Sequence, residues 1–404
     1  MTWKKASESD MLTYGVIADG SLRVALEKGE IKERYWNPGD IFDEVHVLTL
    51  ADDDVKPEQV QAVAGRGRLR IYPIGRPRPQ NLLALRRRAE ETLQRARPDI
   101  IRGHGPFLQG YFAVRAAHRL DVPSFVSIHD DISIYRRFWT YGDGYAKITA
   151  YQLGLKALGW ERYVYAHADR LVPKYEAAAR ILRKSRYRHK VQVIYNSIHL
   201  ERFQNLRPRL LRGERLRIIN VGRQFAGKDQ RPLIQALTHI DAELTLVGTG
   251  PLRSALEVTA REAGVSDRVT FIDAVPNARL PQIFEGHHVF VMNITQPGIS
   301  MTVMEAMALG FPIVINRPRW ESKPEVCGSC ARIVVDGARG FAAAYNEFLD
   351  DPELVARQGE RSRGQIQAYS GEEMERREHD LIAGLVGVTN MSGANGPRAA
   401  LGGG

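Results

Sequence analysis

The sequence predicts an α/β protein built on doubly wound parallel sheets in two domains. Short apolar, β-branched runs alternate with helix-like stretches along the whole chain, a pattern typical of parallel sheets covered by helices. Twelve such runs are too many for one ordinary domain, and 404 residues also suggest more than one. The composition, 44% hydrophobic and 26% charged, is that of a folded globular chain.

The expected strands form two series. The first comprises Val45–Leu50, Leu69–Pro73, Asp99–Arg102, Ser124–Ile128, Arg170–Val172 and Val191–Tyr195. The second comprises Arg217–Val221, Leu244–Val247, Val269–Ile272, Val289–Met292, Ile313–Asn316 and Arg332–Val335. Helical spacing of apolar residues predicts helices between them, at Asn81–Arg97, Gln109–Leu120 and Ala177–Lys184.

The break between the two series predicts the domain organisation. We expect an N-terminal domain over residues 1–203 and a C-terminal domain over 204–365. Residues 204–214 are expected to form the linker, because their apolar residues follow neither a helical nor a strand spacing. Residues 366–389 are expected to form a helix that packs back on the N-terminal domain. The tail 390–404, rich in glycine and alanine, is expected to be disordered.

Several broad classes are excluded by simple features of the chain. No apolar run approaches the ~20 residues of a membrane span. The N-terminus has no apolar core of a signal peptide, and two cysteines cannot form a disulfide framework. We therefore expect a cytoplasmic protein.

The positive charge is concentrated in one part of the chain. Residues 61–140 hold 15 arginines, no lysine and 6 acids, which accounts for almost all of the formal +10. Such a patch suits nucleic acid, an anionic membrane or a phosphorylated ligand, and the alternative is a solvated arginine-rich face. Because no nucleic-acid-binding motif accompanies the charge, we expect no nucleic acid partner. We expect peripheral association with the inner face of the cell membrane instead.

Three loops of the second series have features of a phosphate site. Ligands of open α/β sheets bind beyond the carboxyl ends of the strands, where these loops lie. Arg223 and Lys228, five residues apart on a glycine-bearing turn, can clamp a diphosphate. Small residues in Val247–Pro251 let backbone approach a ligand, and Gln296–Thr302 precedes a helix whose free N–H groups bind anions.

The segment Met304–Val314 carries a family resemblance. It resembles the C-terminal signature of retaining glycosyltransferases of family 4, which have the GT-B fold of two Rossmann-like domains facing each other across a cleft. Looser matches run along roughly residues 11–386. They are Lys28–Glu30, Arg34–Pro38, Arg97–His104, Ile128–Asp130, Ala168–Arg170, Ile194–Phe203, Val221–Arg223 with Lys228, and Leu246–Leu252.

The resemblance implies a site that holds a nucleotide-sugar donor. Arg223 and Lys228 would neutralise its diphosphate, Glu305 would bind the ribose hydroxyls, and His129 would face the anomeric carbon. The expected catalytic residues are thus His129, Arg223 and Lys228. The expected donor-binding residues are Gly20, Gly222, Arg223, Lys228, Gly248, Val275, Gly298, Ile299, Ser300, Met301, Thr302 and Glu305, and the acceptor-binding residues are His104, Arg137 and Trp139.

The implied reaction is the transfer of a hexose to a saccharide or lipid-linked acceptor in cell-surface polysaccharide or glycoconjugate biosynthesis. No metal or other cofactor is expected, because fixed cations and N–H donors would stabilise the leaving diphosphate. The sequence departs from the family at Pro297, where a glutamate that contacts the donor hexose is usual. That departure leaves the identity of the sugar open.

Other interpretations remain open from the sequence. Glu305 can complete a capping box with Thr302 instead of binding ribose. His129 and His104 can be ordinary buried histidines, and Arg223 and Lys228 can be surface cations. At the level of the whole chain, the alternatives are a non-catalytic nucleotide-binding partner subunit of a glycosyltransferase, and a nucleotide-sugar epimerase or phosphorylase on the same fold.

Overall fold

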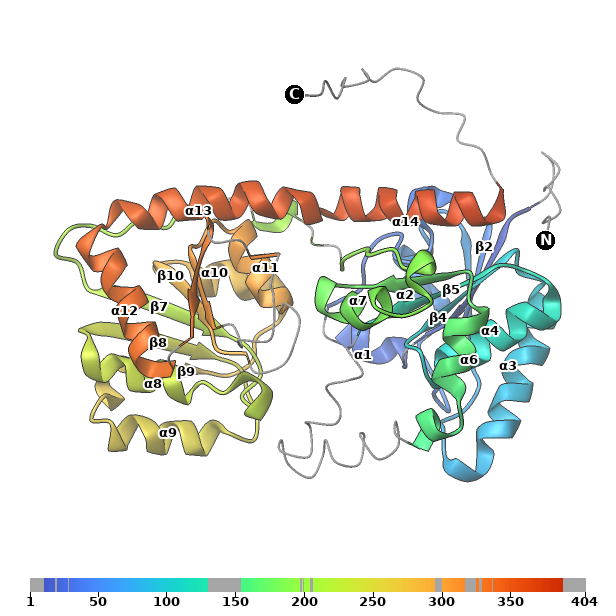
Figure 1. Cartoon of the computed structure of the whole chain (residues 1–404), viewed down its shortest axis with the longest axis horizontal. Helices are drawn as coiled ribbons and strands as arrows, with labels where there is room; N and C mark the ends of the chain where they lie inside the picture. Colours follow the sequence, from blue (N-terminus) through green and yellow to red (C-terminus); the bar gives the residue numbers. More distant parts are fainter. Residues whose placement is uncertain are drawn as a thin grey trace, which may run out of the picture.

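The chain folds into two α/β lobes that lie side by side (Figure 1). The computed structural model describes residues 11–18, 20–27, 29–129, 154–196, 198, 200–203, 206–294, 300–316, 325–326, 329–335 and 337–387. Arg137 and Trp139, the loop residues Gly298 and Ile299, and the tail 390–404 lie outside these residues.

The N-terminal lobe is built on a parallel sheet in the strand order β3-β2-β1-β4-β5-β6. Its strands are β1 (Thr13–Ile17), β2 (Glu44–Thr49), β3 (Arg68–Pro73), β4 (Ile100–His104), β5 (Ser124–Ile128) and β6 (Arg170–Pro173). The helices around it are α1 (Leu22–Glu27), α2 (Pro57–Val60), α3 (Leu82–Ala96), α4 (Leu108–Leu120), α6 (Trp160–His167) and α7 (Glu176–Arg183).

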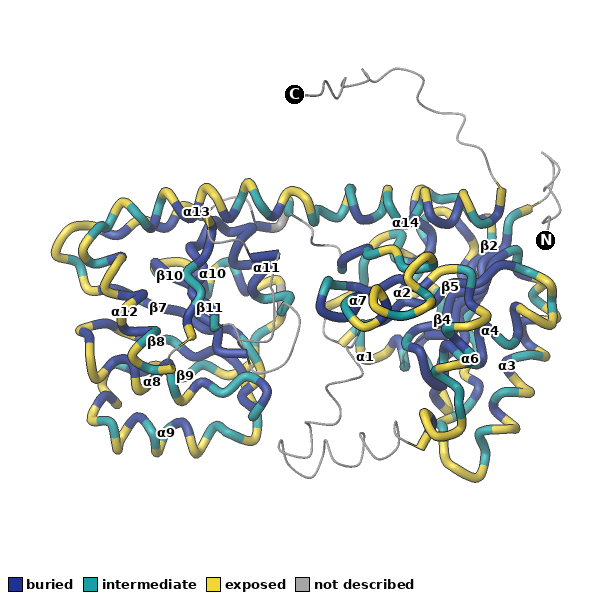
Figure 2. Tube along the Cα trace, viewed as in Figure 1, coloured by how far each residue is buried: buried dark blue, intermediate teal, exposed yellow. Residues whose placement is uncertain are grey.

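The C-terminal lobe repeats the architecture, with a parallel sheet in the order β12-β11-β10-β7-β8-β9. Its strands are β7 (Leu216–Val221), β8 (Ala242–Val247), β9 (Val269–Ile272), β10 (Val289–Met292), β11 (Ile313–Asn316) and β12 (Ala331–Val334). The helices are α8 (Arg231–Ala236), α9 (Arg253–Glu262), α10 (Leu280–Phe284), α11 (Met301–Ala308) and α12 (Gly337–Asp350). Figure 2 shows the buried residues gathered on the strands in both lobes.

Two consecutive helices connect the lobes along one side of the molecule (Figure 1). Helix α13 (Glu353–Ile366) packs on the C-terminal lobe, and α14 (Gly371–Val386) buries Met374 and Ile382 in the N-terminal core beside Tyr14. The hydroxyl of Ser370 caps α14 by accepting from the N–H of Glu373. At this junction the backbone pairs with the other crossing segment, because the Gly371 N–H donates to the carbonyl of Ile198.

The predicted fold class of two doubly wound parallel sheets is confirmed, with two differences in the strands. The prediction missed β1, whose short run includes Gly15; a Cβ there would lie 2.9 Å from Leu93 of α3. The predicted strand Val191–Tyr195 is wrong. This segment makes one isolated bridge, from Val191 to Leu171. Pro173 accepts a hydrogen bond from the Ile194 N–H but has no N–H of its own to donate, so the pairing does not continue as a strand beyond Pro173.

Candidate functional site

A cavity of 1090 Å³ lies between the two lobes, and both contribute its walls. Gly20, His104 and His129 line it from the N-terminal lobe, and Met301 and Glu305 from the C-terminal lobe. His104 ends β4 and His129 follows β5, while Met301 begins the helix after β10. The cavity therefore lies at the carboxyl ends of strands from both sheets, where open α/β sheets bind ligands.

The loop after β7 holds one of the two predicted cations inside the site. Lys228 Nζ donates to Ser300 Oγ at 2.9 Å. Burial lowers the pKa of Lys228, and the nearby carboxylate of Glu305 opposes this. Gly222 lies against the lysine, because a Cβ at Gly222 would be 3.5 Å from Nζ. Arg223 is exposed, with its guanidinium 5.6 Å from the ring centroid of Phe225.

Two glycines of the loop after β8 permit a close backbone contact with the loop after β7. Gly248 has φ +138°, and a Cβ on it would lie 2.2 Å from the carbonyl oxygen of Gly222. A Cβ on Gly250 would lie 2.1 Å from the carbonyl oxygen of Gln224. Because real Cβ atoms do not approach so closely, the two loops keep their positions only with glycine there.

Helix α11 brings three predicted residues to the same place. Ser300 occupies the N-cap position, and its hydroxyl lies 2.9 Å from Thr302 Oγ1 as well as from Lys228. Glu305 is buried on the first turns of the helix and lines the cavity. The capping-box alternative is wrong, because the helix begins at Met301 and Thr302 is already inside it.

Glu305 lies in an electrostatic field that both lobes generate. Burial raises the pKa of its carboxyl to about 7. The positive charges of Lys32 and Lys228 oppose this rise, whereas the carboxylate of Glu30 adds to it. Glu30 and Lys32 belong to the N-terminal lobe and line the same cavity. The protonation of Glu305 therefore depends on both walls of the cleft.

The two histidines predicted on the N-terminal wall lie together. The rings of His104 and His129 stack with centroids 5.7 Å apart and planes 12° apart. Burial, with the charges of Arg102 and Lys174, lowers the pKa of His104 far below its usual range and that of His129 to about 3. Both imidazoles are therefore neutral near pH 7. They offer hydrogen bonds to a ligand but no positive charge.

A buried ion network that the sequence did not indicate lies beneath these rings. Arg102 Nη1 is 2.6 Å and Lys174 Nζ 3.2 Å from the two carboxylate oxygens of Glu378 on α14. Arg102 Nε also donates to Ser127 Oγ at 3.0 Å. An arginine in the apolar run of β4 was the available signal. Its partner is 276 positions away along the chain, beyond the reach of a local pattern.

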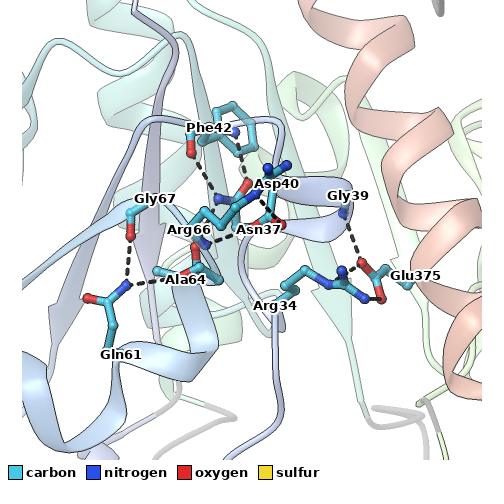
Figure 3. Close-up of polar contacts among 11 residues, drawn as sticks. Arg34, Asn37, Gly39, Asp40, Phe42, Gln61, Ala64, Arg66, Gly67 and Glu375 are labelled. Atoms are coloured by element: carbon cyan, nitrogen blue, oxygen red, sulfur yellow. Dashed lines mark hydrogen bonds and ion pairs between the residues drawn. The ribbon is translucent and has the colours of Figure 1, made fainter. Parts of the chain in front are cut away.

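The segment after α1 is fixed by polar contacts that Figure 3 shows. Arg34 Nε lies 2.8 Å from Glu375 Oε1 on α14, and the Gly39 N–H donates to the same oxygen at 2.9 Å. Asn37 donates to the carbonyls of Phe42 and Ala64, and its own oxygen accepts from the Phe42 N–H. This segment carries Tyr35 and Trp36, which line the cavity and which the sequence analysis did not assign to the site.

Of the predicted site residues that the structure describes, Gly20, His104, His129, Met301 and Glu305 line this cavity. Val275 packs, partly buried, against the apolar core of the C-terminal lobe. In the part of the chain that the structure describes, no cluster of three or more His, Cys, Asp or Glu side chains is arranged to hold a metal ion. None of the described helices is long and apolar enough to cross a bilayer.

Comparisons with known proteins agree with this architecture. The model of Glycosyltransferase Family 4 matches residues 43–202, and that of Glycosyl transferases group 1 matches residues 202–365. The solved structure of Anabaena Alr3699/HepE in complex with UDP superposes with a TM-score of 0.70 at 15% identity, over 93% of this chain and 100% of that one. Sucrose-phosphate synthase from Thermosynechococcus elongatus superposes with a TM-score of 0.69 at 16% identity, over 94% of this chain and 100% of that one. The two facing lobes are thus those of a GT-B protein.

Curated relatives indicate which kind of glycosyltransferase the chain resembles. A GDP-mannose-dependent alpha-mannosyltransferase of Mycolicibacterium smegmatis is 28% identical over 60% of this chain and 60% of its own length. A GDP-mannose-dependent alpha-(1-6)-phosphatidylinositol monomannoside mannosyltransferase of Mycobacterium tuberculosis is 32% identical over 40% of this chain and 46% of its own. The chain therefore spans about half to three fifths of the length of these relatives. It belongs to glycosyltransferase family 4.

Proposed function

We propose that this protein transfers a hexose from a nucleotide sugar to a saccharide or lipid-linked acceptor, with retention of anomeric configuration. The observation that carries the proposal is the grouping of Lys228, Ser300 and Glu305 beside a large cleft at the carboxyl ends of the strands. Two relatives are named as GDP-mannose-dependent, so GDP-mannose is the first donor to test. The transferase relatives do not favour an epimerase or a non-catalytic subunit.

In this proposal each residue has a role that follows from its charge and position. Lys228 and the exposed Arg223 neutralise the donor diphosphate, while the Glu305 carboxylate accepts hydrogen bonds from the ribose hydroxyls. As the bond between the anomeric carbon and the phosphate oxygen breaks, negative charge grows on the diphosphate, and the fixed cations stabilise it. The acceptor hydroxyl attacks on the same face and gives its proton to the leaving phosphate.

Substitution of the two cations tests the donor site. Arg223→Ala and Lys228→Ala should each weaken GDP or UDP binding by about 1.5–3 kcal/mol, because each leaves diphosphate charge uncompensated. This corresponds to a roughly 10- to 150-fold rise in Kd by calorimetry. Arg215→Ala is the matched control, since Arg215 pairs with Asp241 and Glu243 before β7, at the opposite end of that strand. Unchanged affinity in both site variants would overturn the assignment.

We also propose that the N-terminal lobe docks on an anionic membrane surface that carries the acceptor. Ion pairs compensate much of the arginine charge noted in the sequence. Arg66 pairs with Asp40, for example, and Arg70 pairs with Glu44. An excess remains between α3 and α4, where Arg86, Arg115 and Arg119 share the one carboxylate of Glu90. Such an excess attracts anionic headgroups.

Vesicle co-sedimentation tests this docking. The protein should pellet with vesicles containing phosphatidylglycerol and not with phosphatidylcholine alone, and binding should weaken at high salt because exposed charges are screened. The double variant Arg115→Gln with Arg119→Gln should lose most of the binding, at about 1 kcal/mol for each cation. Arg212→Gln with Arg215→Gln, on the other lobe, is the control. Equal pelleting with both vesicle types would contradict the proposal.

A further inference from the structure

Four amide side chains lie at or just beyond the carboxyl ends of the C-terminal strands: Asn220, Gln230, Asn293 and Asn316. Asn220 is on β7 and Asn316 ends β11. Asn293 directly follows β10, and Gln230 occupies the N-cap position of α8. Asn220, Gln230 and Asn293 are buried. Because a buried amide costs free energy unless it is hydrogen-bonded, its partners matter. We call these four residues the amide set.

Each member of the amide set donates to a backbone carbonyl, either on another segment or at the far end of its own loop. The bonds are Asn220 Nδ2 to Val291 (2.8 Å), Asn316 Nδ2 to Ile294 (3.0 Å), Asn293 Nδ2 to Asp229 (2.7 Å) and Gln230 Nε2 to Arg223 (3.3 Å). The Ile294 N–H also donates back to Asn316 Oδ1 at 2.6 Å. The set therefore links β11 to the segment after β10, and that segment to the loop after β7.

These bonds lie at the place where the strand order of the sheet reverses. Strand β7 pairs with β8 on one side and with β10 on the other. The β7–β8 ladder continues to Val221, whereas the registered pairs of β7 with β10 end at Ile219. Beyond that point the side chain of Asn220 makes the link to β10. Ligands of open α/β sheets bind in the crevice that such a reversal opens, so the amide set is placed at a binding crevice.

Two of the bonds hold the loop that carries the proposed phosphate-binding cations. Gln230 holds the carbonyl of Arg223 at the start of this loop. Asn293 holds the carbonyl of Asp229, which directly follows Lys228. Lysine carries a compact charge on a flexible four-carbon stem, so the position of its charge depends on where the backbone is fixed. The two amide bonds therefore restrict where the charge of Lys228 can lie before a ligand binds.

The neutrality of an amide also suits this place. The Asn293 amide nitrogen donates to a carbonyl without bringing a negative charge near Lys228. An aspartate of the same shape would only accept, and it would add the negative charge that the diphosphate is proposed to supply. Amides thus fix the loop and leave its cations for the ligand.

We propose that Asn293 and Gln230 are positioning residues, which hold the two ends of the loop 222–229 so that Lys228 presents its charge to the donor diphosphate. Neither residue touches the donor, and both act through the lysine. The inference rests on the proposed function, because it takes Lys228 as a ligand of the diphosphate. The fixing of the loop itself depends on no ligand, so it can be tested separately.

The experiment uses Asn293→Leu and Gln230→Met in the full chain. Each variant roughly keeps the size of the side chain and removes the amide donor, and thermal unfolding checks that it is folded. Gln61→Met is the matched control. Gln61 Nε2 donates to the carbonyls of Gly65 and Gly67 on the N-terminal lobe, and Gln61 does not line the cavity (Figure 3).

The first arm needs no ligand. Hydrogen exchange, followed by mass spectrometry, reports on the backbone of residues 222–230, which includes the Lys228 N–H that donates to Phe225. Both site variants should exchange about fivefold faster or more there, because loss of a hydrogen bond loosens the loop, whereas the control should match wild type. The pKa of Lys228, read from the pH dependence of its acetylation, should rise, because burial lowers it in the wild-type protein.

The second arm measures the Kd of GDP and UDP by calorimetry. Asn293→Leu should weaken binding of whichever nucleotide the wild type binds by about fivefold. In the Lys228→Ala background the same substitution should change the Kd by less than about twofold, because the residue through which Asn293 acts is gone. A merely structural role would give the same loss in both backgrounds.

Several results would overturn the inference. Exchange in the loop equal to that of the control does so, and so does faster exchange with unchanged nucleotide affinity. An equal loss of affinity with and without Lys228 also does so, since Asn293 would then act elsewhere. Should Asn293→Leu fail to fold, Gln230→Met decides in both arms. Wild-type protein that binds neither nucleotide refutes the proposed donor site, and the exchange arm then still decides whether the amides fix the loop.

Discussion

The buried cations of the two lobes have different kinds of partner. In the N-terminal lobe, Arg102 and Lys174 are each within 3.2 Å of a carboxylate oxygen of Glu378. In the C-terminal lobe, Lys228 donates to a hydroxyl, and Glu305 influences its pKa without an ion pair between them. In the N-terminal lobe the two cations share the one carboxylate of Glu378, which ties α14 to the sheet. A cation whose partner is a neutral hydroxyl keeps its charge for a ligand.

The largest effect is expected from breaking the paired set. Glu378→Gln leaves Arg102 and Lys174 buried without a counter-charge, which costs about 3–5 kcal/mol in comparable buried pairs. Denaturant unfolding should show this loss. Glu373→Gln on the same helix is the control, because Glu373 pairs with Arg376 and Arg377 near the surface and should cost only about 0–1 kcal/mol. Equal losses in both variants would mean that the network stabilises no more than a surface pair.

A smaller effect, with a distinctive pH dependence, is expected from Glu305→Gln. The raised pKa of about 7 means that the folded protein binds this proton more tightly than the unfolded chain. The stability from Glu305 is therefore present below about pH 4.5 and lost as pH rises through 7. The variant should gain stability relative to wild type across this range and then stay level. Thermal unfolding of both proteins from pH 4.5 to 8 measures the difference.

The same variant should bind nucleotide less tightly at pH 8. A charged acceptor makes a hydrogen bond worth about 1 kcal/mol more than a neutral one, so a loss of roughly fivefold in affinity is expected. Calorimetry with GDP or UDP measures it.

The stability prediction for Glu305→Gln has its own contradicting outcome. A stability difference that does not change with pH would show that Glu305 titrates normally, and its burial would then have little electrostatic consequence.

Much of the fold could be predicted because a parallel strand buried on both faces is a continuous apolar run. Val289–Met292 and Ile313–Asn316 were located in this way. The central strand β1 was missed, since its run is short and includes Gly15, which is small for a reason outside its own segment. A sequence pattern within one segment reflects only the interactions of that segment. The close packing of α3 on β1 joins two separate segments, so the pattern of β1 alone does not reveal it.

The candidate site shows the same difference between residues that a local pattern reveals and contacts that it does not. The loops that hold Gly222, Lys228 and Gly248 were located from their glycines and charges, whereas Glu305 was expected only from the family resemblance. The binding roles of all four residues stay predictions. The network of Arg102 with Glu378 and the contact of Trp36 with His104 could not be predicted. In both cases the partners lie far apart in the sequence, and only the folded chain brings them together.

The two places where the chain crosses between lobes are joined to each other by the bond from Gly371 to Ile198. Because the two crossings lie next to each other, any movement of one lobe relative to the other has to bend the chain at this one place. Since α14 is fixed to the N-terminal lobe through Glu375 and Glu378, the bend lies before that helix. If the cleft opens or closes, α14 is expected to move with the N-terminal lobe although it follows the C-terminal lobe in the chain.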